Sequence, residues 1–241
     1  MGLYRDHGIV LRTFRLGEAD RIVTVLTQGH GKVRAVAKGV RKTLSRFGGR
    51  LEPTSHVALQ FYEGRELDVV TQVDGIEQFR ALREDLDRLG KAHVILEVAD
   101  HVAQERQPDP RLYRMVIGAL RALAAHDATL LVPAFLLKVL AAEGASPVLD
   151  ECAVCGEDEP LVAFDLARGG ALCRPCAGTA RAPAISPEAL VLVRRALSGD
   201  LIGVLNETPG ATALEVERLA TRSFEGHVER RLRAPTVLDR P

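Results

Sequence analysis

The sequence lacks the segments that direct a chain into a membrane or across it. No apolar stretch follows a basic start near the N-terminus, and no run approaches about eighteen uninterrupted apolar residues. We therefore expect a cytoplasmic, nucleoid-associated protein with no membrane partner. With 46% hydrophobic and 27% charged residues, the chain can form an ordinary core, and this excludes wholesale disorder.

Sequence motifs of the common enzyme classes are missing as well. The chain contains no GxxxxGK[ST], no HExxH, no GxSxG and no GxGxxG. The seven histidines show no spacing typical of a metal site or a catalytic triad. We expect a protein that is not an enzyme and has no catalytic residues. A metal-dependent nuclease is the weaker alternative, and incubation of labelled DNA with Mg²⁺ or Mn²⁺ separates the two.

Acidic residues are absent from a long internal window, although the net charge of the chain is +0. No Asp or Glu occurs from Arg21 to Leu51, and residues 32–50 read KVRAVAKGVRKTLSRFGGR. Cations held at successive strand and loop positions can contact successive phosphates, with an affinity that depends on salt rather than on base sequence. The predicted nucleic-acid contacts are Lys32, Arg34, Lys38, Arg41, Lys42, Arg46 and Arg50.

An aromatic side chain within this basic stretch is a further candidate. Six of the ten aromatic residues occur in the first 80 residues, and most of them are expected to fill a core. We expect only Phe47 to be free to stack on bases. Two other interpretations of the basic stretch stay open, namely a solvated loop and an adaptor surface that binds an acidic partner peptide.

Five short segments with β character occupy the first third of the chain. They lie at residues 8–14, 21–27, 32–38, 56–62 and 67–73, and turn residues separate them. Five strands in so short a segment suit a small closed barrel. An oligonucleotide-binding (OB) fold is the first choice, and an SH3-like barrel is its rival.

The periodicity of apolar residues changes to that of helices after residue 76. Helices are predicted at 76–90, 93–106, 110–126, 132–144, 187–198 and 213–232, and their apolar faces are expected to form a mutual core. The fold class is thus α+β and multidomain. The expected domains are an OB barrel at 1–80, helical parts at 81–150 and 184–241, and a zinc-binding element at 151–183.

Four cysteines form two pairs with the spacing C-x2-C-x17-C-x2-C. Cys152 and Cys155 belong to CAVCG, and Cys173 and Cys176 belong to CRPC. Each pair can bring two thiolates to one tetrahedral ion, and the residues between the pairs can form a hairpin that returns the second pair. We predict one structural Zn²⁺. Disulfides and unligated thiols are the alternatives, and disulfides fit poorly with a cytoplasmic chain.

The order of these motifs resembles the RecO family of bacterial DNA repair and recombination mediators. The features that carry the resemblance are GEADRIV, the TQGHGK turn, AKGVRKTLSRFGGRLEP, the LREDLDRLGKAHVILEVAD helix, the LLKVLAAEGASPVLDECAVCG junction and GGALCRPC. Two stretches depart from the family pattern. Pro53-Thr54 replaces a proline followed by an aromatic residue, and HVERRLRAPTV replaces a C-terminal Lys-Ser pair.

The resemblance implies an OB fold, a helical region and a zinc element packed within it. It implies a non-enzymatic activity, namely binding of single- and double-stranded DNA and annealing of complementary strands. Its implied protein partners are RecR, the acidic C-terminal tail of single-strand-binding protein and, indirectly, the RecA recombinase that is loaded onto DNA. It assigns DNA contact to the same basic residues and metal ligation to the four cysteines.

Overall fold

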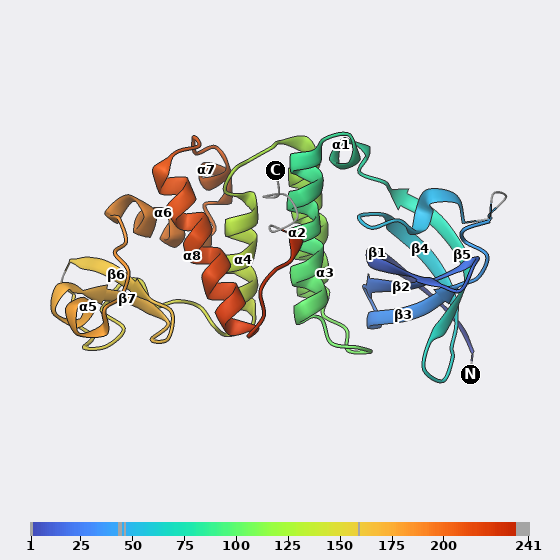
Figure 1. Cartoon of the computed structure of the whole chain (residues 1–241), viewed down its shortest axis with the longest axis horizontal. Helices are drawn as coiled ribbons and strands as arrows, with labels where there is room; N and C mark the ends of the chain where they lie inside the picture. The colour runs from blue at the N-terminus through green and yellow to red at the C-terminus, as the bar shows by residue number, and fades with distance from the viewer. Residues whose placement is uncertain (1, 43–44, 46, 159, 235–241) are drawn as a thin grey trace. The chain divides into compact units, whose positions relative to one another are not determined.

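The computed structural model describes residues 2–42, 45, 47–158 and 160–234. The chain forms two compact units, one made of residues 1–126 with the segment that starts at Leu232, and one made of residues 127–231 (Figure 1). Among the described residues, no helix is both long and apolar enough to cross a membrane.

The first unit begins with a closed five-stranded β-barrel (Figure 1). Its strands are β1 (Leu3–Leu16), β2 (Asp20–Thr27), β3 (Gly31–Ala37), β4 (His56–Tyr62) and β5 (Asp68–Glu77), in the spatial order β1-β2-β3-β5-β4. Every pairing is antiparallel except that of β3 with β5. This closed arrangement confirms the predicted OB fold.

A β-bulge in β1 lets one strand pair with two neighbours. The first half of β1 pairs with β4 and the second half with β2, and the register shifts between Val10 and Arg12. The extra residue reverses which face the following side chains occupy. Val10 points into the barrel core, whereas Arg12 lies opposite Thr24 on the outer face. In the part of β1 that follows the bulge, the side chains of even-numbered residues therefore point outward.

Beyond the barrel, the described part of the first unit contains the α-helices α1 (Arg80–Arg83), α2 (Leu86–Val102) and α3 (Pro110–Ala125). The predicted helices at 76–90 and 93–106 are wrong in their bounds, because β5 continues to Glu77 and α2 runs without a break through Gly90. The carboxylate of Asp85 accepts hydrogen bonds from the amides of Asp87 and Arg88, which sets the start of α2 at Leu86.

The second unit combines helices with a two-stranded sheet. Its elements are α4 (Leu131–Ala142), β6 (Leu161–Asp165), β7 (Gly170–Cys173), α5 (Arg174–Ala180), α6 (Pro187–Ser198), α7 (Leu201–Leu205) and α8 (Ala211–His227). Helix α4 packs against α6 and α8. The antiparallel pairing of β6 with β7 confirms the hairpin predicted between the two cysteine pairs.

Candidate nucleic-acid interface and metal site

Two of the predicted cations lie on β3 beside acidic groups of the first unit. Lys32 donates a hydrogen bond to the backbone carbonyl of Asp100 at 2.6 Å, and its side chain is only 14% exposed. The carboxylate of Asp100 also accepts from Arg12 at 2.8 Å. Arg34 stays more exposed, with its guanidinium 3.9 Å from the carboxylate of Glu105. Lys32 is therefore largely engaged within the chain, whereas Arg34 can still reach a ligand.

The loop that follows β3 carries the more accessible cations. Lys38, Arg41 and Lys42 are all exposed. The loop is anchored to the β1–β2 turn, because the amide of Gly39 donates to the carboxylate of Asp20 at 2.7 Å. Arg41 donates to the turn as well, from its amide to the carbonyl of residue 19 and from its guanidinium to that of residue 18. This anchoring holds the three cations at one end of the barrel.

The remaining basic residues of the predicted interface differ in their placement. Arg50 is half-buried, and its guanidinium donates a hydrogen bond of 3.4 Å to the carbonyl oxygen of Phe47. Arg46 lies outside the described residues. Within the described part of the barrel, the predicted contacts thus comprise three exposed loop cations, the exposed Arg34, the enclosed Lys32 and the half-buried Arg50.

The expectation that Phe47 is free to stack on bases is wrong. Its side chain is 1% exposed and belongs to the barrel core, where Leu51 joins it. A short 3-10 helix, η1 (Gly48–Leu51), follows Phe47 directly. Burial of two large apolar side chains at the end of the barrel outweighs the polarity of the neighbouring sequence. A flanking series of cations does not by itself keep an aromatic side chain at the surface.

Phe14 and Tyr62 are instead the exposed aromatic residues among the described strands of the barrel, and Phe14 is the more exposed of the two. Its side chain is 52% exposed, and the guanidinium of Arg12 lies 5.0 Å from the centre of its ring. That distance is within the range of a cation–π interaction. In a regular strand, Phe14 would project from the same face as the buried Val10. The β-bulge between Val10 and Arg12 moves Phe14 to the outer face. The sequence carried no clear signal of the bulge.

A segment between α2 and α3 lies along the free side of β3. The amide of Lys32 donates to the carbonyl of Gln104, and the amide of Arg106 donates to the carbonyl of Lys32, both at 3.1 Å. Gly31 makes this approach possible, since a Cβ there would lie 2.0 Å from the carbonyl oxygen of Gln107. The segment therefore acts as an additional short strand beside the barrel.

A buried carboxylate fixes the same segment. Asp68 is fully buried, and it accepts hydrogen bonds from Tyr4, from Arg106 at 2.6 Å and from the amide of Gly64 at 3.0 Å. Burial raises the pKa of Asp68, but these three donors outweigh it and hold the pKa below its ordinary value. Asp68 is therefore ionised at neutral pH and holds Arg106 against the barrel.

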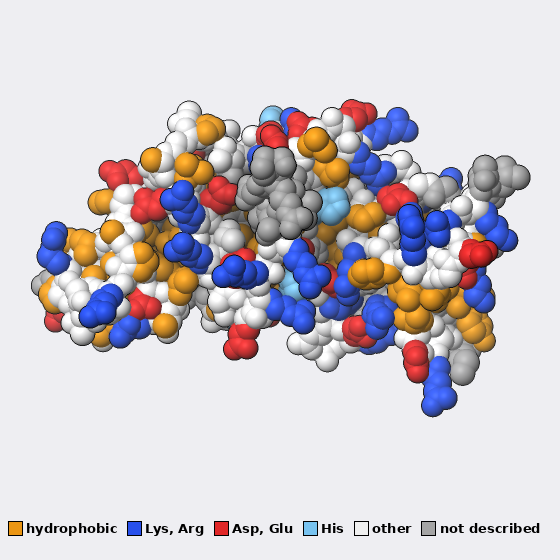
Figure 2. Space-filling model, viewed as in Figure 1, with side chains coloured by type: hydrophobic (Ala, Val, Ile, Leu, Met, Phe, Trp, Pro, Cys, Tyr) orange, Lys and Arg blue, Asp and Glu red, His pale blue; other side chains and the backbone are white. Residues whose placement is uncertain are grey.

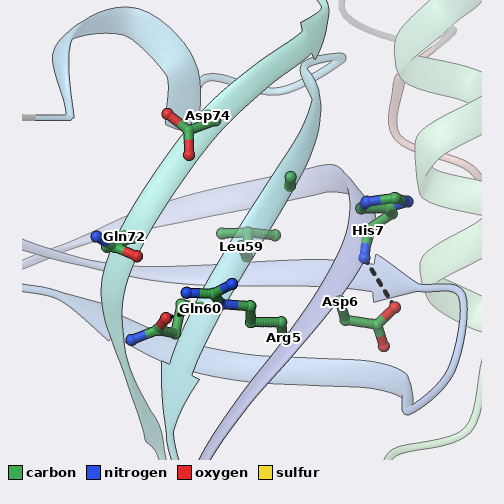
Figure 3. A pocket seen from close by; sticks show the side chains of 8 residues that line it. Arg5, Asp6, His7, Leu59, Gln60, Gln72 and Asp74 are labelled. Carbon is green, nitrogen blue, oxygen red and sulfur yellow. Dashed lines mark hydrogen bonds between the residues drawn. The ribbon is translucent and has the colours of Figure 1, made fainter.

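A polar depression of about 520 Å³ lies over β1, β4 and β5 (Figure 3). It is lined by residues of both charge signs, including Arg5, Asp6 and Asp74, and by the amides of Gln60 and Gln72. Arg5 donates to Gln60 at 2.9 Å. None of the predicted nucleic-acid contacts that the structure describes lines this depression, so it is separate from those basic residues.

The four cysteines converge in the second unit. Their sulfur atoms all lie within 4.8 Å of one another, and those of Cys155 and Cys173 are 3.7 Å apart. Four sulfurs at about 2.3 Å from a central ion form a tetrahedron with edges of about 3.8 Å. Within the part of the chain that the structure describes, this is the one group of three or more His, Cys, Asp or Glu side chains close enough to hold a metal ion.

Local backbone geometry brings the two cysteine pairs into this arrangement. Gly156 has a φ of 73° and donates its amide to the carbonyl of Cys152 at 2.9 Å, which closes the first turn. Strand β7 ends at Cys173, and Cys176 follows in the first turn of α5. Burial raises the pKa of Cys152, but surrounding backbone amides lower it to about 6. Four sulfur atoms at this spacing fit a metal that binds thiolates.

Comparison with known families covers nearly the whole chain. The family model described as Recombination protein O N terminal matches residues 1–79. The model described as Recombination protein O C terminal matches residues 83–235. The first match coincides with the barrel, and the second includes helices α2 to α8 and the cysteine cluster.

Proposed function

Because the chain belongs to the RecO family of recombination mediators in DNA repair, we propose that its barrel binds single- and double-stranded DNA and anneals complementary strands. The observation that carries this proposal is the group of exposed cations Lys38, Arg41 and Lys42 on an OB barrel. No acidic residue occurs between Arg21 and Leu51 to neutralise them from within the same stretch.

Annealing follows from charge neutralisation and requires no bond chemistry. Two complementary strands repel each other through their phosphates, and cations that bind both strands reduce this repulsion. The same contacts raise the local concentration of one strand beside the other. Since phosphates carry no base identity, the base pairs themselves select the partner strand. In this proposal the protein is a mediator and not an enzyme.

Replacement of the three exposed loop cations tests the proposal. We expect the combined change Lys38→Ala, Arg41→Ala and Lys42→Ala to weaken DNA binding by about 10- to 100-fold for all base sequences alike. The slope of log affinity against log salt concentration is expected to fall by about 2 to 3, because fewer counterions are released. Fluorescence anisotropy over a series of salt concentrations measures both, and a strand-annealing assay measures the loss of activity.

A variant with the same loss of charge outside the barrel is the matched control. Arg80→Ala, Arg114→Ala and Arg231→Ala remove three exposed arginines, and we expect them to leave the salt slope unchanged. Equal effects of the two triple variants would contradict the placement of the interface. If the loop variant binds DNA normally but loses an acidic peptide, the adaptor alternative holds instead. Cleavage of labelled DNA with Mg²⁺ or Mn²⁺ would favour the nuclease.

Removal of the acid beside Arg34 is expected to strengthen DNA binding rather than weaken it. Glu105 competes with a phosphate for the guanidinium of Arg34, which is 3.9 Å away. We expect Glu105→Gln to tighten DNA binding about two- to threefold at low salt, in line with the small energy of an exposed ion pair. Glu84→Gln removes an exposed acid from the same unit and serves as the control. Equal gains in both variants would show an effect of net charge alone.

The protein partners of the proposed mediator are RecR, single-strand-binding protein and, through loading, RecA. Family membership supports these partners. The acidic, apolar-ended tail of single-strand-binding protein needs a hydrophobic slot with cations beside it. A groove of about 240 Å³ in the second unit has this character, since Phe164 and Leu219 line it together with Arg218 and Arg222. We place the tail there as part of the proposal.

We propose that the metal held by the cysteine cluster is a single structural Zn²⁺. Four thiolates leave no open position for a substrate, which is typical of structural zinc rather than of catalytic zinc. Zinc supplies a cross-link between the two cysteine pairs. The surrounding residues bury Cys152 and Cys173 and pack small side chains of α5 against them.

A further inference from the structure

An apolar row crosses the outer surface of the barrel. Phe14 lies opposite Ile22, Ile22 lies opposite Val36, and Val36 lies opposite Val69. Directly paired residues project from the same face of a sheet. We name these four residues the outer stripe. Phe14 is 52% exposed, and the other three are half-buried.

The outer stripe is not part of the barrel core. Residues next to it in the strands, such as Val23, Ala35 and Val70, point into the interior. Farther along the outer face of β2, Thr24 and Leu26 are buried, and the neighbouring residue Lys32 is bonded to Gln104. The part of this outer face around Thr24 and Leu26 is therefore covered by the first unit itself, whereas the stripe stays accessible.

Cations border the outer stripe on both sides. The adjoining row on one side contains Arg12 and Arg34, which both lie opposite Thr24. On the other side, β3 leads into Lys38 and the anchored loop with Arg41. Figure 2 shows hydrophobic side chains at the surface of the barrel with Lys and Arg side chains beside them.

Two acidic residues near the outer stripe already bind groups of this chain. Asp20 accepts from the amide of Gly39, and Asp100 pairs with Arg12. Glu105, at 3.9 Å from Arg34, is the weaker competitor. A ligand of this surface must therefore combine negative charge along its length with flat apolar groups between the charges.

We infer that the outer stripe is a stacking platform for unpaired nucleobases, with Phe14 as the residue that distinguishes a single strand from a duplex. Bases lie on Phe14 and its aliphatic neighbours, while the phosphates lie on the cations at either side. Duplex DNA hides the faces of its bases and presents phosphates only. This inference rests on the proposed DNA binding and adds the class of ligand that this face selects.

Removal of the ring tests the inference. We expect Phe14→Ala to weaken binding of a single-stranded oligonucleotide by about 5- to 150-fold, as stacking of one to a few bases requires. Binding of an abasic strand of equal length, which keeps the phosphates and lacks the bases, is expected to stay unchanged. Leu3→Ala is the matched control, because Leu3 is an exposed residue of the same strand outside the stripe.

A second variant gives a direct signal and keeps the test independent of folding. The chain contains no tryptophan, so Phe14→Trp introduces a single indole on the platform. We expect this variant to retain binding of the intact strand. Its fluorescence is expected to be quenched by the intact strand and not by the abasic strand, since only a stacked base contacts the ring.

The possible outcomes separate this inference from the proposed function. If the wild type binds neither strand, both fail. If the wild type binds the strands but Phe14→Ala weakens neither, or weakens both equally, only the stacking platform is overturned. If Phe14→Ala leaves DNA binding intact but abolishes binding of a partner protein, the stripe is a protein-docking surface and the inference is again overturned.

Discussion

Replacement of Cys152 by serine is expected to remove the metal and to unfold the cysteine-bearing part of the second unit. Structural zinc contributes on the order of 10 kcal/mol to the folding of small domains, because the site does not exist in the unfolded chain. A loss of this size is comparable to the entire free energy of unfolding of a typical domain. Calorimetry is expected to show loss of a transition, and elemental analysis is expected to show loss of one zinc per chain.

Ala153→Ser is the matched control for this experiment. It introduces the same hydroxyl at the adjacent position and leaves all four thiolates in place. We expect normal metal content and a normal transition for this variant, and a chelator is expected to reproduce the effect of Cys152→Ser on the wild type. An unchanged melting temperature after complete removal of the metal would exclude a structural role, and a metal other than zinc would correct its identity.

Removal of Arg106 is expected to give the second large effect. Asp68 is fully buried and receives the guanidinium of Arg106 at 2.6 Å. After Arg106→Ala, the donors to this carboxylate that the structure describes are Tyr4 and the amide of Gly64. Loss of one donor to a buried carboxylate costs about 1 to 3 kcal/mol, less than for a fully buried ion pair because the Arg106 side chain is 44% exposed. Urea unfolding near neutral pH measures the change in the free energy of unfolding.

The dependence of stability on pH provides a sharper test of this carboxylate. In the wild type the pKa of Asp68 is depressed, so its contribution is present above the unfolded pKa and is lost as the pH falls through the folded pKa. In Arg106→Ala, burial is expected to dominate and to raise that pKa. The free energy of unfolding of the variant should then approach that of the wild type in part, as the pH falls from neutral toward the pKa of Asp68 in the unfolded chain.

A double variant and an exposed arginine complete this design. Asp68→Asn in the Arg106→Ala background removes the buried charge, and we expect it to recover part of the lost stability. Arg114→Ala removes an exposed arginine of α3 and is expected to change the unfolding free energy by less than about 0.5 kcal/mol. If Arg106→Ala behaves like Arg114→Ala, the ion pair contributes nothing.

The sequence predicted those features that depend on local patterns. Alternating β-branched residues predicted the five strands, and β4 occupies residues 56–62 as expected. Pro187 and the following apolar periodicity predicted α6, which begins at Pro187 and ends at Ser198. The cysteine spacing predicted a cluster, and the four sulfurs lie together. Each of these signals is contained in a few neighbouring residues.

The features that the sequence did not reveal depend on contacts between distant residues. Lys32 is enclosed because Asp100 lies beside it, and no local pattern links two positions so far apart in the chain. The exposure of Phe14 and the burial of Phe47, the reverse of what we expected, have the same origin. A single extra residue in β1 turns Phe14 outward, and Phe47 packs into the barrel core with residues of several strands. Both depend on how the barrel closes.

The short parallel pairing of β3 with β5 limits how far the barrel can be treated as a transferable module. Only two residue pairs join these strands, and the segment at Gln104–Arg106 pairs with β3 where β5 does not. A fragment that stops at the end of β5 would retain the charge of Asp68 without its guanidinium partner. Gene fusions, domain swaps and evolutionary transfers of this barrel should therefore carry the helix that follows it and the first residues beyond.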